Sequence, residues 1–211
     1  MRVHEFRSYI NSFMVFAFFL AFNLLTNDLG LLKNVSKAAA VAGTILIAIT
    51  LLLGPLSRFF PGHFRHDLIY RKPLGIAGFF FAAVHVVVAF FNSYNADIYY
   101  IFSESNPNFL PAVYGTVAFL ILIALALTST ASAIKNMGFR KWKMLQRTGY
   151  IALALIMLHF ATLGGGYFLK TNTGKTLLAL GIIAIAAKIL VLLLDIPKKH
   201  SKEEIKHLTK E

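Results

Sequence analysis

The chain has 211 residues, of which 57% are hydrophobic and only 14% are charged, and its mean hydropathy is +0.67. These values exclude an ordinary soluble domain and indicate a protein of the bilayer. It contains no cysteine, which excludes disulfides, iron–sulfur clusters, thiolate ligation and thiol catalysis. Although the net charge is +12, no nucleic-acid partner is expected, because the basic residues cluster in alternate connections rather than on one surface.

The apolar residues form six uncharged runs that are each long enough to cross about 30 Å of hydrocarbon. They predict an all-α integral membrane protein, a bundle of six transmembrane helices. We expect one domain over 1–197 and a polar cytosolic tail over 198–211. The first run is expected to be a retained anchor, because no small-residue cleavage pattern follows it. The six runs are 9–25, 38–56, 73–91, 111–133, 148–163 and 176–194.

Proline and glycine mark the expected helix boundaries. Gly54 and Pro55 stand near the end of the second run, whereas Pro73 and Pro111 open the third and fourth runs. Proline is tolerated in a first helical turn, where its missing N–H leaves no bond unmade.

The basic residues predict the orientation of the bundle. The amino terminus, the connections before the third and fifth runs, and the tail hold 16 of the 21 Lys and Arg residues, and the other connections hold four. By the positive-inside rule, both termini are cytosolic. The remaining base, Lys188, lies inside the sixth run, where its side chain either snorkels to the headgroups or lies beside a cofactor propionate.

Two histidines lie deep inside apolar runs at nearly equal depth. His85 is 13 residues beyond Lys72 and His159 is 12 beyond Arg147, so both imidazoles lie roughly 18–20 Å from the basic face. Ionisable residues inside a span are costly and usually functional. A planar iron porphyrin held by two helices would use both imidazoles and leave no axial position open, which suits electron transfer. The alternative is that each histidine only hydrogen-bonds to a neighbouring helix.

Small residues share one helical face with His85. Gly75, Gly78 and Ala82 precede it at spacings of three, four and three, which predicts a smooth face. Because His85 lies on this face, we expect Gly75, Gly78 and Ala82 to lie against a flat macrocycle. Tight packing of two helices is the alternative.

The other polar residues indicate less. His63 and His66 lie three apart in a basic connection, where a solvated surface is the default and a metal or second haem the alternative. His4, His200 and His207 lie in polar ends. No catalytic triad, carboxylate pair or phosphate loop is present in the sequence, so hydrolysis is not indicated.

The stretches 71–90 and 127–160 resemble the ferric reductase-like transmembrane family. The similarity is strongest to haem-binding membrane subunits of bacterial periplasmic methionine-sulfoxide reductase systems. It rests on an Arg-x-x-Leu-Gly motif opening the third run, a Leu-Thr-Ser motif ending the fourth, Trp142 before the fifth, and both deep histidines. The resemblance implies that His85 and His159 are outer-side ligands of a haem b.

The sequence departs from this family at one position. Members commonly carry a histidine between Leu and Arg near the start of the fifth run, where this chain has Gln146. Either one haem binds, or a second inner haem or a flavin is held by other groups, such as His63, His66 or the surroundings of Arg71 and Trp142. An aromatic relay near Trp142 and Gln146 is also expected.

The resemblance implies a b-type cytochrome in a bacterial inner membrane, acting as the electron-transfer subunit of an oxidoreductase. Its expected donor is a cytosolic flavin- or NAD(P)H-dependent reductase. Its expected acceptor lies outside: a periplasmic oxidoreductase subunit, a ferric chelate or oxygen. The alternative is a haem-free transporter or assembly factor that uses its histidines for proton relay or helix packing.

Overall fold

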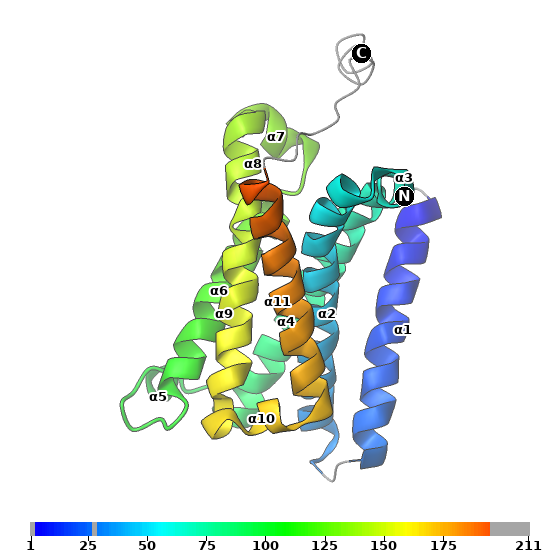
Figure 1. The fold of residues 1–211 in the computed structure, drawn as a ribbon. Helices are drawn as coiled ribbons and strands as arrows, with labels where there is room; N and C mark the ends of the chain where they lie inside the picture. The colour runs from blue at the N-terminus through cyan, green and yellow to red at the C-terminus, as the bar shows by residue number, and fades with distance from the viewer. Residues whose placement is uncertain (1–2, 27–28, 195–211) are drawn as a thin grey trace.

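The computed structural model describes residues 3–26 and 29–194, and all regular structure within them is helical (Figure 1). The expected tail 198–211, with His200 and His207, lies outside the described residues. In chain order the helices are α1 Val3–Thr26, α2 Leu31–Phe59, α3 Pro61–Phe64, η1 His66–Tyr70, α4 Arg71–Ser93, α5 Ile98–Ile101, α6 Phe109–Leu127, α7 Ala131–Met137, α8 Phe139–Arg147, α9 Gly149–Thr162, η2 Leu163–Gly166, α10 Tyr167–Lys170 and α11 Asn172–Leu193.

Within residues 3–26 and 29–194, six helical stretches are long and apolar enough to cross a membrane, which agrees with the expected number. The long helices α1, α2, α4, α6, α9 and α11 run alternately up and down, so the start of α1 and the end of α11 lie at the same end of the bundle (Figure 1). We call this the basic end, because it also carries α3, η1, α7 and α8 with their Arg and Lys residues. The short helices α5 and α10 lie at the opposite end.

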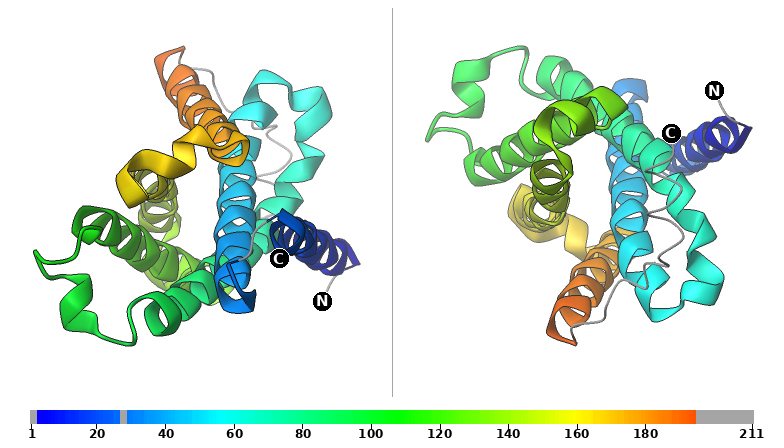
Figure 2. Two further views of the ribbon diagram at one scale, coloured as in Figure 1. Left: turned by 90° about the horizontal axis from the view of Figure 1, so that it is seen from below. Right: turned by 90° about the horizontal axis from the view of Figure 1, so that it is seen from above.

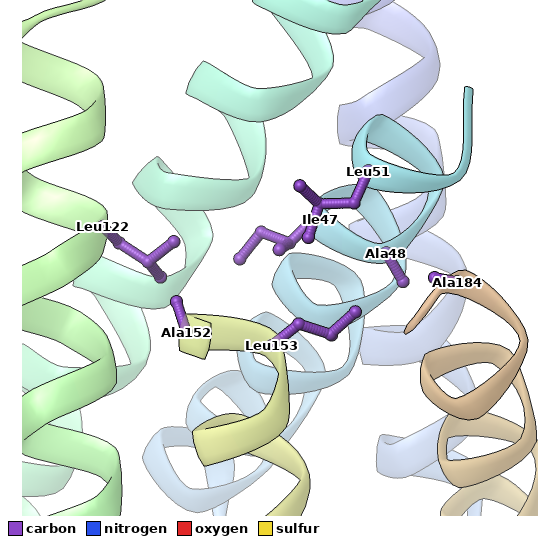
Figure 3. Packing of buried hydrophobic residues seen from close by; sticks show 7 residues of the cluster. All are labelled: Ile47, Ala48, Leu51, Leu122, Ala152, Leu153 and Ala184. Atoms are coloured by element: carbon purple, nitrogen blue, oxygen red, sulfur yellow. The ribbon is translucent and has the colours of Figure 1, made fainter. Parts of the chain in front are cut away.

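Helix α2 is the centre of the bundle. It packs against α1, α4, α9 and α11, as the views along the bundle show (Figure 2). Its buried residues are mostly small in the first half and branched in the second. Near its middle Ile47, Ala48 and Leu51 join a core cluster with residues of three other helices (Figure 3), namely Leu122 of α6, Ala152 and Leu153 of α9, and Ala184 of α11.

The small-residue face of α4 is covered by α2. A Cβ on Gly78 would lie 2.9 Å from Ile47 Cγ1, and one on Gly43 would lie 3.1 Å from the Gly78 carbonyl oxygen. A Cβ on Gly75 would lie 3.4 Å from Thr50. Gly78 and Gly43 thus let α2 and α4 approach closely, while the expectation that Gly75, Gly78 and Ala82 line a cofactor stays a prediction. Tight helix packing, the alternative, is what the glycines permit.

Helix α1 turns its polar residues inward and its large apolar residues outward. Ser8, Ser12 and Asn23 are its only buried residues, whereas Phe13 and Phe18 are each more than 60% exposed. This arrangement is the reverse of that in a soluble protein. It is stable when the surroundings are lipid, because small polar residues then mediate contacts between helices.

Helix α2 continues four residues past Pro55 to Phe59, although the sequence predicted its end near Gly54 and Pro55. A proline inside a helix removes one N–H and frees the carbonyl four residues earlier. That carbonyl, of Leu51, accepts a hydrogen bond from the Tyr150 hydroxyl of α9 at 2.8 Å. The neighbouring Thr50 carbonyl accepts from Arg71 Nε at 3.1 Å. Donors from other helices therefore replace the missing bond, and the helix persists.

Helix α6 ends at Leu127, six residues before the predicted end of the fourth run. Its last carbonyls accept bonds from α8: Trp142 Nε1 donates to the Thr128 carbonyl at 2.9 Å, and Gln146 Nε2 donates to the Leu125 carbonyl at 3.3 Å. Thr130 then caps the next helix, α7, by accepting from the backbone N–H of Ala133. The chain therefore turns after Leu127, whereas the sequence predicted that the helix would continue to residue 133.

Replacing Tyr150 with phenylalanine tests the hydrogen bond that its hydroxyl donates to the Leu51 carbonyl. The Leu51 carbonyl would lose its donor where no water can replace it, which costs about 1 kcal/mol in membrane proteins. We expect Tyr150→Phe to lower the free energy of unfolding by that amount in mixed micelles. Tyr167→Phe is the matched control, because Tyr167 is 71% exposed. Equal stability of the two variants would show that the bond contributes nothing.

Candidate functional site

The two deep histidines face each other across the bundle. His85 of α4 and His159 of α9 have ring centroids 6.2 Å apart and ring planes inclined at 73°. The prediction that both imidazoles lie at one depth is confirmed. Helix α4 packs chiefly on α2, and α9 chiefly on α6. The pair therefore lies where two packed helix pairs meet.

A backbone carbonyl fixes the tautomer of His159. Its Nδ1 lies 2.8 Å from the carbonyl oxygen of Pro111, in the first turn of α6. A carbonyl oxygen can only accept, so Nδ1 must carry the proton. In the neutral ring Nε2 then has a free lone pair, which is the form that binds a metal.

His85 is held in the same way by α2. Its Nδ1 lies 3.1 Å from the Ser36 carbonyl oxygen and 2.9 Å from the Ser36 hydroxyl. With the proton on Nδ1 both oxygens accept, whereas the other tautomer would set two lone pairs against each other at the carbonyl. His85 therefore also keeps its Nε2 lone pair. Donation of the second ring N–H to a carbonyl is the usual support of a metal-bound histidine.

Gly115 of α6 makes room for the His159 ring. A Cβ at this position would lie 2.8 Å from His159 Nδ1. The glycine lets the imidazole approach α6 closely enough to reach the Pro111 carbonyl one turn earlier. Sequence reasoning missed Gly115 and Ser36. The partners of a histidine on another helix cannot be inferred from sequence spacing. The sequence offered one signal, a glycine among the bulky residues of the fourth run.

The separation of the two rings fits a shared metal ion. Bonds from imidazole nitrogen to a protein-bound transition metal are about 2 Å long, and the ring centroid lies about 1.1 Å behind the nitrogen. Two imidazoles on opposite sides of one metal therefore have centroids about 6 Å apart, close to the 6.2 Å observed. The donor set, two neutral nitrogens without thiolate or carboxylate, suits haem iron.

Toward the basic end, aromatic side chains bridge the two helix pairs. The rings of Phe79 on α4 and Phe119 on α6 stack with centroids 5.9 Å apart and planes inclined at 14°. Phe79 precedes His85 by six residues, about 9 Å of helix. This contact joins α4 to α6 on the basic-end side of the histidine pair.

The expected inner-site residues are used to hold helices together. Arg71 donates to the Thr50 carbonyl, Trp142 to the Thr128 carbonyl, and Gln146 to both the Leu125 carbonyl and the Thr128 hydroxyl. The side-chain N–H groups of these three residues therefore stabilise the packing of helices at the basic end. The structure does not bring a histidine to the position of Gln146.

His63 and His66 are exposed, on α3 and η1 at the basic end. The described residues contain no group of three or more His, Cys, Asp or Glu side chains that could hold a metal ion. A solvated surface, the default expectation for both residues, agrees with their exposure.

Lys188 lies well away from the histidine pair. Its Nζ is 5.9 Å from the centroid of the Tyr150 ring. Tyr150 precedes His159 by nine residues, about 14 Å along α9. This position does not fit the expectation of a lysine beside a propionate of a cofactor held between the imidazoles.

Comparison with known families gives one match that covers more than half of the chain. Residues 39–157 match the family described as ferric reductase like transmembrane component. The matched segment includes α4 with His85, and it ends two residues before His159.

Two groups of individual proteins are similar to the chain. The magnetosome protein MamZ of Magnetospirillum gryphiswaldense is 39% identical over 98 residues, which are 43% of this chain and 14% of that protein. The protein-methionine-sulfoxide reductase heme-binding subunit MsrQ of Herminiimonas arsenicoxydans is 29% identical over 146 residues, 67% of this chain and 64% of that protein. MsrQ of Deinococcus radiodurans is 31% identical over 91 residues. The chain thus spans less than two thirds of the length of these relatives.

The place of Gly115 gives a prediction about the site. In Gly115→Ala the new methyl group displaces the His159 ring, so we expect loss of the Nδ1–H signal in ¹⁵N-histidine NMR spectra. Such overpacking costs about 1–3 kcal/mol in the free energy of unfolding. Gly62→Ala is the control, because a Cβ there would meet nothing within 4 Å. A His159 signal unchanged from the wild type would contradict the packing described.

Proposed function

The chain belongs to the ferric reductase-like transmembrane family as a multi-pass integral membrane protein, and from this premise we propose that it is a haem-binding electron-transfer subunit. The observation that carries the proposal is the histidine pair: two rings 6.2 Å apart, each bonded through Nδ1 to a backbone carbonyl. The named role of the MsrQ relatives, a heme-binding subunit, agrees with it.

The protein would supply two histidine ligands and the carbonyl oxygens that orient them. His85 and His159 would hold the haem from α4 and α9, while Ser36 and Pro111 keep their rings oriented. Haem b supplies one-electron redox chemistry when bound. With His85 and His159 both engaged on the haem, the chain would leave no open place for a gas, which favours electron transfer over gas binding.

The distribution of charge supports an orientation and a donor. Arg and Lys residues dominate the basic end, so by the positive-inside rule we infer that this end is cytosolic. We propose a bacterial inner membrane because the similar MsrQ proteins are bacterial. The exposed cations would attract an acidic protein. We infer a cytosolic flavin- or NAD(P)H-dependent reductase as donor, and as acceptor a periplasmic oxidoreductase subunit, a ferric chelate or oxygen. The aromatic relay near Trp142 and Gln146 stays a prediction.

A haem-free transporter or assembly factor is the alternative. Its histidines would need only the bonds they make to Ser36 and Pro111. That function gives no reason for the two rings to face each other with Nε2 unused on both.

Substitution of either histidine tests the proposal. His85→Ala and His159→Ala should each abolish the low-spin haem absorption and electron paramagnetic resonance signals, because one axial ligand is lost. His66→Ala is the control, since this exposed histidine lies at the basic end. A low-spin spectrum that survives in either deep variant would refute the ligand assignment, and a colourless wild-type protein from haem-replete cells would favour the alternative.

The contacts of Arg71 and Gln146 favour one haem per chain. Neither residue is a haem ligand, and both bond to carbonyls of neighbouring helices. We therefore expect a haem-to-protein ratio of 1 in the purified full chain by pyridine hemochrome assay. Gln146→His tests whether one added imidazole is enough to create a second haem site. We expect the ratio to stay at 1, because Arg71, the other residue expected at an inner site, is bonded to the Thr50 carbonyl. A ratio of 2 in the wild type would contradict this stoichiometry.

A further inference from the structure

A small pocket between α9 and α11 opens at the basic end. Arg147, Tyr150, Lys188 and Leu192 line it, and its volume is about 210 Å³. Tyr150 is held in place because its hydroxyl donates to the Leu51 carbonyl of α2. The ring therefore forms a fixed wall, with the Lys188 ammonium 5.9 Å from its centroid. The histidine pair lies about 14 Å away along α9, so the pocket is a separate feature.

The pocket concentrates positive charge. Two of its four lining residues, Arg147 and Lys188, are cationic. Among the described residues, α8, α9 and α11 carry no Asp or Glu, and neither Lys188 nor Arg147 has a carboxylate partner. Like charges gathered beside a hydrocarbon phase are unfavourable unless an anion joins them. The site thus has the charge of an anion-binding pocket.

The surroundings indicate which anion it takes. Leu192 lines the pocket, and it is exposed together with Ile151 and Ile189, which are the sequence neighbours of Tyr150 and Lys188. In a membrane these apolar side chains meet lipid acyl chains. Lys188 lies five residues before the end of α11, about 8 Å along the helix, which is close to the level of the headgroups. An occupant must therefore be amphiphilic, with its negative group next to its apolar part.

We propose that this pocket binds the phosphate headgroup of an anionic phospholipid, with Lys188 and Arg147 as its cationic contacts and the acyl chains along the exposed faces of α9 and α11. Basic pockets between transmembrane helices on the cytosolic side are known to favour such headgroups. The bound lipid would neutralise the basic end and connect α9 to α11. This role does not depend on the haem.

Native mass spectrometry of the full chain in detergent, with its own cofactor content, tests the proposal. Phosphatidylglycerol, phosphatidylcholine and inorganic phosphate are added separately. The wild type should bind phosphatidylglycerol about tenfold more tightly than phosphatidylcholine, and Lys188→Gln and Arg147→Gln should each weaken phosphatidylglycerol binding about fivefold, as expected for one charge near the surface. The double variant should lose about 30-fold.

Two kinds of variant control for charge and folding. Lys175→Gln removes one charge from the first turn of the same helix at the opposite end and should leave phosphatidylglycerol affinity unchanged. Arg147→Lys keeps the charge and should retain most of the affinity. The proposal is overturned if phosphatidylcholine binds as tightly as phosphatidylglycerol, or if the pocket variants match Lys175→Gln. Displacement of the lipid by equimolar inorganic phosphate would assign the pocket to free phosphate instead.

Discussion

The constraint on which this structure depends is that a helix carbonyl inside a membrane must find its donor within the protein. Long-range hydrogen bonds from side chains to carbonyls recur at each critical point of the bundle. Tyr150 and Arg71 donate to the carbonyls of Leu51 and Thr50, one turn before Pro55. Trp142 and Gln146 donate to carbonyls at the end of α6. Such bonds fix which helices are neighbours and at what height, which apolar packing alone specifies poorly when the solvent is also apolar.

The candidate site uses the same kind of bond for a different purpose. His85 donates to a carbonyl of α2 and His159 to a carbonyl of α6. Each bond ties a helix to its packing partner, and each leaves Nε2 of the neutral ring with its lone pair. A bond that a haem-free protein could use for packing is therefore also the support that a metal ligand requires. Under the proposed function, the same two bonds would therefore serve both helix packing and orientation of the haem ligands.

Sequence reasoning predicted what depends on local composition. Length and hydropathy predicted six spans, and distance from charged residues predicted that His85 and His159 lie at one depth. It did not predict what depends on neighbours. The end of α2 was placed near Pro55 because the Tyr150 hydroxyl that repairs the helix lies 95 residues further on. The small residues of α4 were assigned to a cofactor because their spacing shows that they share a face. Spacing does not show that α2 packs against that face. Ser36 and Gly115 were missed for the same reason.

The two ends of the bundle use their polar side chains differently. Toward the opposite end, glycine and serine leave the imidazoles close together with unused nitrogens. Toward the basic end, the positions of Arg71 and Gln146 are occupied by donors that reach carbonyls of other helices. Replacing Gln146 with a haem ligand would remove its hydrogen bond to the Leu125 carbonyl at the end of α6. Replacing Arg71 with a neutral ligand would remove the donor to the Thr50 carbonyl. Stability of the basic half and a second cofactor site there therefore compete for the same side chains. In this chain Arg71 and Gln146 make the stabilising contacts, which is the reason for proposing a single haem near the opposite end.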